Sequence, residues 1–375
     1  MNKFYYISNS VIPSKTANSV HAMKMCAALA RNGVRVELLG KKMRRTAYGG
    51  EDILLRYGVK DKFKLNLYSL YGKSFLSPII NFIFFPFFIF FKAKDALIYS
   101  RNVHCSFVLS FILRVPHVYE SHGVSSKLIN SWVEKRVLRS SSITKVVAIS
   151  EVLKQDLLVR YKVAKEKVVV VHDAADEVDD LPSIPEFKLC GEYDFNVGYA
   201  GSLLQGKGVE LLCEAALRLP RYAFHIAGGD GDTLNKLKKR YKNASNLFFY
   251  GHLSQPDVMG FLNEIDVAVL PNMAKVLTAD GEDIGKYTSP LKLFEYMSFR
   301  KKIVISDIAV FREIVSPAQV YFFKNSDVAS LAQTIDESVN VEKDIDSLFD
   351  LFVDKYTWSK RARRVIRICE RCRKE

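Results

Sequence analysis

The stretch GSLLQGKG, residues 201–208, has the spacing of a phosphate-binding loop. Gly201, Gly206 and Lys207 follow the G-x-x-x-x-G-K pattern of nucleotide triphosphatases, in which backbone N–H groups surround a phosphate and the lysine adds a positive charge. That pattern continues with a Ser or Thr whose hydroxyl holds Mg²⁺, whereas this chain has Gly208. Three interpretations remain open: a damaged triphosphatase loop, a phosphate site that uses no metal, or a surface turn with a solvated lysine.

A second candidate anion site lies in TSPLKLFEYM, residues 288–297. Ser289 can cap a helix, and the N–H groups of Leu291 and Lys292 would then point outwards at the positive end of the helix dipole. Glu295 lies one helical turn beyond Leu291, on the same face, where a carboxylate can accept hydrogen bonds from sugar hydroxyls. The same pattern also fits an ordinary capped amphipathic helix whose apolar side chains are core, and both interpretations can hold.

Three polar residues of the first half are candidates for a ligand-binding site. Arg101 follows the run DALIYS and His122 follows HVYES, so both lie at the carboxyl ends of predicted strands, where open α/β sheets bind ligands. Arg101 could contact an anionic ligand. For His122 a structural role is the alternative, and His21, on the first predicted helix, also fits a core or surface histidine.

Strands and helices alternate along both halves of the chain. KFYYIS, SVHAMKMCAALARNG and VRVELLG form a βαβ unit, and the loop after the first strand lacks G-x-G-x-x-G, which disfavours a dinucleotide. An acidic linker with two prolines separates the halves. The pattern predicts two doubly wound α/β domains, residues 1–178 and 190–354, with the site in the cleft between them. The further predicted strands are DALIYS, HVYESH, KVVAIS, KVVVVH, FNVGYAG, YAFHIAGG, NLFFYG, DVAVLP and KKIVISD.

Charge is unevenly distributed along the 375 residues, whose net charge is +14. Residues 1–172 hold 28 Lys and Arg and 10 Asp and Glu, a net charge of +18, which would attract nucleic acid, anionic lipid or a phosphorylated substrate. No nucleic-acid-binding module is recognisable, and aromatic residues do not interleave with the basic ones. The six irregularly spaced cysteines indicate reduced thiols of a cytoplasmic protein, with Cys369 and Cys372 as exposed helical thiols.

One apolar stretch, FLSPIINFIFFPFFIFF at residues 75–91, invites a membrane interpretation. It is short for a membrane span and is interrupted by two prolines and an asparagine. It is therefore interpreted as either an interfacial helix or a core helix packed on the sheet. The N-terminus has no apolar run followed by a small-residue cleavage site, so no secretory signal is expected.

From about residue 195 to 315 the chain resembles the retaining, nucleotide-sugar-dependent glycosyltransferases of family 4, which have the GT-B fold. The resemblance is carried by GSLLQGKGVELLCEA, IAGGDG, NLFFYGHLSQPDV, DVAVLP, SPLKLFEYM and KKIVISDIAVFREIV, in that succession. The first half matches more loosely, through SVHAMKMCAALARNG, IYSRN, VYESHG and VVAISEVL. KYTWSKRARRV, residues 355–365, resembles the closing helix of that family, so residues 355–375 are expected to join the first domain.

The resemblance implies a role for each candidate residue. Lys207 and the N–H groups of Leu291 and Lys292 would stabilise the negative charge that grows on the leaving β-phosphate, so no metal ion and no cofactor beyond the donor would be needed. His122 would contact the transferred sugar near the reaction centre, so His122 and Lys207 are the candidate catalytic residues. Arg101, which could contact an anionic acceptor, and His21 would lie on the acceptor side, and Glu295 would hold the ribose hydroxyls. Gly201, Ser202 and Gly228 belong to the loops that correspond to the donor-binding ones. Family frequency favours a UDP-sugar.

The chain departs from the family pattern at two positions. Many members have Arg where this chain has Ser202, and Lys292 is a candidate for the replacement cation. Many also have Glu eight residues before Glu295, to read the donor sugar, where this chain has Tyr287. Tyr287 is therefore expected to influence which sugar is transferred, and the identity of that sugar is not implied.

The leading hypothesis is a metal-independent transferase of lipopolysaccharide or other surface-polysaccharide biosynthesis. It would move a sugar to a lipid-linked saccharide or similar precursor. It would be cytoplasmic and peripheral on the inner leaflet, docked through residues 75–91 and the basic first domain. A P-loop-like nucleotide triphosphatase and a basic nucleic-acid-binding protein are the alternatives.

Overall fold

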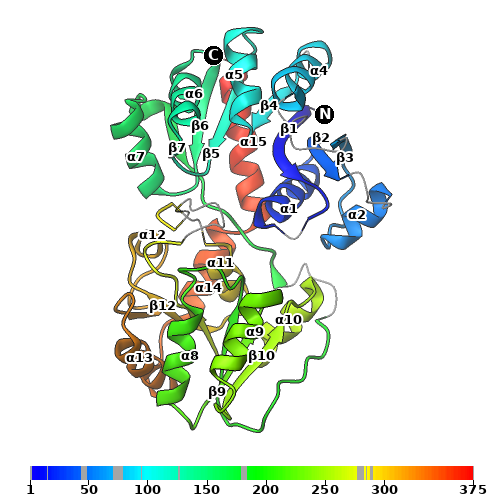
Figure 1. The fold of residues 1–375 in the computed structure, drawn as a ribbon. Coiled ribbons are helices and arrows are strands. Elements are labelled where there is room, and N and C mark those ends of the chain that lie inside the picture. Colours follow the sequence, from blue (N-terminus) through cyan, green and yellow to red (C-terminus); the bar gives the residue numbers. More distant parts are fainter. Residues whose placement is uncertain are drawn as a thin grey trace. The chain divides into compact units, whose positions relative to one another are not determined.

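The chain divides into two compact units in the computed structural model (Figure 1). Unit 1 comprises Met1–His172 together with Trp358–Glu375, and unit 2 comprises Asp173–Thr357. The structure describes residues 2–14, 16–43, 49–70, 79–93, 95–125, 127–178, 184–276, 283, 285–287 and 290–374.

Unit 1 is built on a seven-stranded sheet of order β3-β2-β1-β4-β5-β6-β7, in which every pairing is parallel. The order reverses between β1 and β4, so their carboxyl ends form the switch point where such sheets bind ligands. The strands are β1 (Lys3–Val11), β2 (Arg35–Met43), β3 (Lys64–Leu70), β4 (Leu97–Ser100), β5 (His117–Ser121), β6 (Ile143–Ala148) and β7 (Val168–Val170).

Helices cover this sheet because its strands are apolar on both faces. Phe4, Tyr5, Tyr6 and Ile7 of β1 are all fully buried, as expected for a central parallel strand. The helical segments are α1 (Ala17–Arg31), α2 (Gly50–Arg56), the π-helical turn η1 (Ile80–Phe84), α4 (Phe85–Lys92), α5 (Val103–Phe111), α6 (Leu128–Arg139), α7 (Glu151–Tyr161), the short 3₁₀ turn η2 (Lys165–Lys167) and α15 (Trp358–Lys374).

The last helix, α15, packs inside unit 1, against α1 and the strands β4, β5 and β6 (Figure 1, the red helix among blue and cyan elements). Its buried side chains Arg361, Ala362, Val365 and Cys369 recur at helical spacing and form one stripe that faces the sheet. Cys369 was expected to be exposed, and this prediction is wrong: it lies on that stripe and is 3% exposed.

Unit 2 is built on a six-stranded parallel sheet of order β10-β9-β8-β11-β12-β13, with its switch point between β8 and β11. Its strands are β8 (Asn196–Ala200), β9 (Ala223–Ala227), β10 (Leu247–Gly251), β11 (Val267–Leu270), β12 (Lys302–Ser306) and β13 (Tyr321–Phe323). Its helices are α8 (Val209–Arg218), α9 (Gly231–Arg240), α10 (Gln255–Glu264), α11 (Leu291–Ser298), α12 (Ala309–Arg312), α13 (Val328–Asn340) and α14 (Ile345–Lys355).

The predicted strands are all present, and two further strands, β3 and β13, were not predicted. The Phe-rich stretch forms a helical segment from Ile80 to Lys92, in which η1 runs into α4; its first residues, 75–78, lie outside the described part of the chain. Phe85 and Ile89 of this segment are buried against Tyr5 and Leu39 of the sheet, so the segment is partly core.

Candidate active site

The loop after β8 carries Lys207 to the switch point of unit 2. The loop packs against the chain that follows β11, since the Met273 N–H donates to the Gly206 carbonyl at 2.8 Å. Gly208 is the N-cap of α8 with φ +75°, a backbone conformation that glycine adopts without strain. A Cβ at Gly208 would lie 1.8 Å from the Pro271 carbonyl oxygen. The backbone therefore has no room for the Ser or Thr of a triphosphatase loop at this position.

Two lysine ammonium groups converge at this switch point. Burial and the nearby Lys292 ammonium both lower the pKa of Lys207. Lys292 Nζ also donates to Glu295 Oε2 at 2.7 Å, so one of the two ammonium groups is paired with a carboxylate. Like charges held close together repel, and an anion placed between them relieves that repulsion. The arrangement therefore suits a ligand that carries more negative charge than Glu295 supplies.

Helix α11 points its N-terminus into the same region. Pro290 is its N-cap, and its first helical turn closes where the Leu293 N–H donates to the Pro290 carbonyl at 2.9 Å. The N–H groups of Leu291 and Lys292 precede that bond and have no acceptor within the helix. Ser289, the expected cap, lies outside the described residues. The amides and the dipole of α11 therefore reinforce the two ammonium groups.

The hydroxyl group of Tyr296 connects helix α11 to β8, the strand that precedes the loop of Lys207. Tyr296, fully buried on α11, accepts a hydrogen bond from the Ala200 N–H at 3.0 Å, at the end of β8. Phe294 and Met297, predicted to be core, are also fully buried, whereas Leu291 is only partly buried. Buried anchors on one side of α11 thus leave Lys292 and Glu295 part-exposed on the other.

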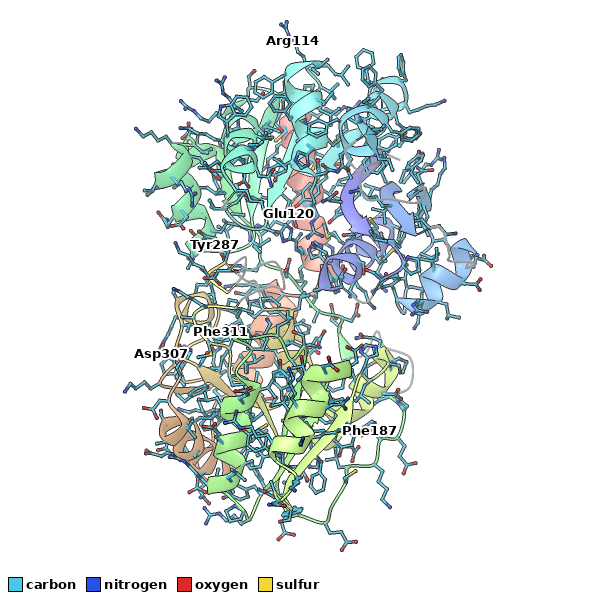
Figure 2. The ribbon with its side chains drawn as sticks, in the orientation of Figure 1. Arg114, Glu120, Phe187, Tyr287, Asp307 and Phe311 are labelled. Carbon is cyan, nitrogen blue, oxygen red and sulfur yellow. The ribbon has the colours of Figure 1, made fainter. Side chains whose placement is uncertain are left out.

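The remaining donor-side candidates lie around this pair of elements. Gly228 follows β9 with φ +131°, and a Cβ there would lie 1.7 Å from the Gly201 carbonyl oxygen, so the loops after β8 and β9 are in direct contact. Ser202 is exposed, and its carbonyl accepts a hydrogen bond from the Tyr199 hydroxyl at 2.7 Å. Tyr287 is buried, with the Lys286 ammonium 5.2 Å from its ring centre (Figure 2).

The three candidates of unit 1 also come together, beside the switch point of its own sheet. Arg101 follows β4, and its Nη1 lies 2.5 Å from His21 Nδ1 while its Nη2 lies 3.3 Å from His122 Nδ1. His122 follows β5, and about a third of its side chain is exposed (32%). His21 is buried, and its ring makes an edge contact with Trp358 of α15. The guanidinium group of Arg101, which was expected to contact the acceptor, thus also contacts two histidines inside unit 1.

Two residues at the centre of this group were not predicted. Glu120 and Arg361 are both fully buried, and Arg361 Nη2 lies 3.3 Å from Glu120 Oε2. The sequence did hold a signal for Glu120. This glutamate lies two residues before His122 on one predicted strand, so both side chains lie on the same face of the sheet. Nothing local to Arg361 distinguishes it from the other basic residues of its helix.

Comparison with known protein families shows to which class of protein this chain belongs. The family described as Glycosyl transferases group 1 matches residues 186–348, and the one described as Glycosyltransferase Family 4 matches residues 19–177. Together with two parallel Rossmann-like sheets, these matches define the class as proteins of the glycosyltransferase families with the GT-B fold. The chain belongs to the family-4 type of these transferases, which confirms the resemblance seen in the sequence.

Individual relatives point to the same class. The chain is 27% identical over 214 residues to the O-antigen biosynthesis glycosyltransferase WbnH of Escherichia coli, and equally to WbiN of that species, a probable enzyme of the same kind. The match covers 54% of this chain and 56% of each relative, so it spans about half of their length.

Solved structures share the fold along the whole chain. A glycosyltransferase from Rickettsia africae superposes with a TM-score of 0.75 at 15% identity and covers 100% of both chains. Anabaena HepE, in complex with UDP and glucose, superposes with a TM-score of 0.70 at 15% identity and covers 99% of this chain and 100% of its own. Within the part of the chain that the structure describes, no helix has the length and apolar character needed to cross a membrane.

Proposed function

We propose that the enzyme transfers a sugar from a nucleoside diphosphate sugar, with retention of configuration and without a metal ion. The acceptor would be a saccharide or lipid-linked precursor of a surface polysaccharide. The observation that carries this proposal is the convergence of Lys207, Lys292 and the N-terminus of α11 at the switch point of unit 2. The family-4 assignment supports retention, and the O-antigen relatives support the polysaccharide acceptor.

The two ammonium groups would act on the leaving group. As the bond from the anomeric carbon to the phosphate oxygen breaks, negative charge grows on the β-phosphate. Lys207 and the N–H groups of Leu291 and Lys292 are then aimed at the charge that develops, which is the arrangement that lowers a barrier most. Glu295 would accept hydrogen bonds from the ribose hydroxyls, and His122 would contact the transferred sugar.

The steric limit at Gly208 argues against a triphosphatase. A P-loop enzyme needs the hydroxyl that follows its lysine to hold Mg²⁺, and this backbone excludes a side chain there. Two ammonium groups and a helix N-terminus supply the positive charge that a metal would otherwise bring. A UDP-sugar is our preferred donor because HepE, of the same fold, was solved with UDP and glucose.

Nucleotide binding should therefore survive complete removal of divalent metal. Thermal unfolding would be followed in excess EDTA with UDP, ADP and GDP in turn, and with UDP-sugars. UDP at 100 times its dissociation constant should add about 2.7 kcal/mol to the free energy of unfolding. A rise in the unfolding temperature that appears only when Mg²⁺ is restored would contradict metal-free binding. A rise with ADP or GDP but not with UDP would show that the donor carries that other nucleotide.

We also propose that the enzyme works in the cytoplasm as a peripheral protein on the inner leaflet. Among the described residues, 17 large apolar side chains are exposed, and 11 of them lie on η1, α4, α5 and α6 or directly beside them. Helix α5 packs against both α6 and the η1–α4 segment, so these helices are neighbours on unit 1 (Figure 1). The eleven are Ile79, Ile83, Phe84, Phe87, Phe90, Phe91, Phe111, Ile112, Leu128, Ile129 and Trp132.

The charge of unit 1 matches an anionic surface. Unit 1 holds 36 basic and 12 acidic residues, a net charge of +24, whereas unit 2 holds 19 and 29, a net charge of −10. Arg136 lies over the Trp132 ring at 5.2 Å, and Arg114 projects into solvent beyond α5 (Figure 2). Each Lys or Arg near an anionic bilayer contributes about 1 kcal/mol, and exposed aromatic side chains add apolar burial.

Vesicle co-sedimentation should show binding to anionic but not to neutral phosphatidylcholine vesicles, and the binding should weaken as salt rises. A variant with Phe87→Ser, Phe90→Ser and Phe91→Ser should bind at least about tenfold more weakly, since a fully buried Phe contributes roughly 1.5–3 kcal/mol. The neighbouring Phe88 is left unchanged because its ring packs against the Tyr5 ring, with the two ring centres 6.2 Å apart.

Leu217→Ser, at an exposed leucine of unit 2, is the matched control. Equal recovery in the supernatant with both vesicle types would contradict docking, and dimer formation would show that a second copy covers this surface.

A further inference from the structure

A fully buried carboxylate lies at the centre of the unit 1 site. Glu120 is near the end of β5, between β4 and β6, and is 1% exposed. Because side chains alternate along a strand, Glu120 and His122 project from the same face of the sheet. Helices α1 and α15 pack over that face, and Figure 2 shows Glu120 beside α15 in the interior of unit 1.

Five groups from four segments surround this carboxylate. His122 Nε2 lies 2.5 Å from Oε1, and Arg101 Nε lies 3.2 Å from the same oxygen and donates to His122 Nε2 at 2.8 Å. Arg361 Nη2 of α15 lies 3.3 Å from Oε2, which also accepts the Tyr99 hydroxyl of β4. His21 Nε2 of α1 is 3.8 Å from Oε1.

The charge state of Glu120 follows from these contacts. Burial by itself would raise the pKa of a carboxyl group, but the guanidinium groups of Arg361 and Arg101 hold the pKa of Glu120 well below its usual range. Glu120 is therefore an anion throughout the physiological pH range. A buried anion that accepts from an imidazole N–H selects the tautomer and the orientation of that ring.

We infer that Glu120 is a positioning residue for sugar transfer: its carboxylate holds the His122 ring in one orientation and one tautomer and ties the ring, with Arg101, to helix α15 through Arg361. This inference rests on the proposed contact of His122 with the transferred sugar. His122 Nε2 faces Glu120 Oε1 and the Arg101 Nε–H, so the ring directs Nδ1 away from Glu120, within 3.3 Å of Arg101 Nη2. A ring free to rotate or to change tautomer would keep this arrangement only part of the time.

The test uses Glu120→Gln in the full-length protein. Turnover is measured as hydrolysis of the UDP-sugar selected by thermal shift, and the ring ¹⁵N signals of His122 are assigned by their loss in His122→Asn. We expect kcat to fall about 10–100-fold, as for other groups that orient a functional histidine, while KM for the UDP-sugar is unchanged. The wild-type ring should hold a single tautomer, and the ring of the variant a mixture of tautomers.

Glutamine at position 120 leaves Arg361 buried without its anion, which can unfold the protein. The double variant Glu120→Gln, Arg361→Met removes both charges at similar volume and should fold, with the same fall in kcat and the same change of tautomer. Glu134→Gln is the matched control, because Glu134 is also a buried glutamate of unit 1 but bonds to Tyr161 at 3.0 Å instead. It should change thermal stability and leave kcat and the His122 signals unaltered.

A folded double variant with wild-type kcat, or with the wild-type His122 tautomer, would overturn the inference. Failure of the underlying function has a different signature. If His122→Ala turns over normally while Glu120→Gln still shifts the His122 tautomer, the ring is positioned as inferred but does not act on the sugar.

Discussion

Replacing Lys207 with alanine should lower turnover by about 10²–10³ while the protein stays folded, because the ammonium stabilises charge that is fully developed only in the transition state. Burial and the neighbouring Lys292 ammonium both lower the pKa of Lys207. UDP release from the UDP-sugar measures the effect, and the thermal unfolding midpoint verifies folding. Lys239→Ala, at an exposed lysine of α9, is the matched control and should turn over at the wild-type rate.

The pH dependence of UDP binding gives a second readout of the same group. A bound diphosphate should raise the pKa of Lys207 above its lowered value in the free enzyme. UDP should therefore bind with its full affinity below the pKa of Lys207 in the free enzyme. That affinity should decline as the pH rises through this pKa. Equal turnover of Lys207→Ala and Lys239→Ala would exclude the role of Lys207 at the leaving group.

His122→Ala should reduce turnover by about 10²-fold, the lower end of what a positioned polar group at a reaction centre contributes. The ring is part-exposed at the carboxyl end of β5 and held from behind by Glu120 and Arg101. Binding of UDP alone should be unchanged, since the residues proposed for the diphosphate belong to unit 2. The measurement is kcat for UDP-sugar hydrolysis alongside the UDP dissociation constant.

His104→Ala provides the comparison for that variant. His104 is a histidine of α5 in the same unit, and its ring contacts Phe82 at 4.9 Å. Burial lowers the pKa of His104, so its loss removes a neutral, partly buried ring of the same size. If His104→Ala and His122→Ala lose turnover equally, the effect belongs to packing and the proposed contact of His122 with the sugar is wrong.

The donor side of the site was predictable because its signals are local. A strand, a glycine-rich loop, a lysine and a helix follow one another between Asn196 and Arg218, and each is set by residues within a few positions. The proximity of Lys207 and Lys292 needed only the rule that loops at one switch point converge. The two missed strands have weak local signals: β13 has three residues, and β3 lies at the sheet edge with half-exposed side chains.

The cluster around Glu120 could not be predicted in the same way. Its charge balance depends on Arg361, which is 241 residues away along the chain, and the basic residues of α15 look alike in sequence. Burial distinguishes them: among the described side chains of that helix, Arg361 is the one basic residue that lies on the stripe facing the sheet. The Phe-rich stretch posed a similar problem: its composition could not separate Phe85, which is fully buried, from Phe91, which is 73% exposed.

The contribution of α15 to unit 1 has a consequence for synthesis of the chain on the ribosome. Unit 2 is continuous in sequence, whereas unit 1 lacks its last helix until residues 358–374 have emerged. Until then the Glu120 carboxylate has no Arg361 beside it, and the apolar stripe of α15 is missing from the sheet. Domains usually fold in the order in which they are translated. Here we expect the later-translated unit to complete its fold first, so the half that carries the basic helices proposed to face the membrane would mature only after residues 358–374 have emerged.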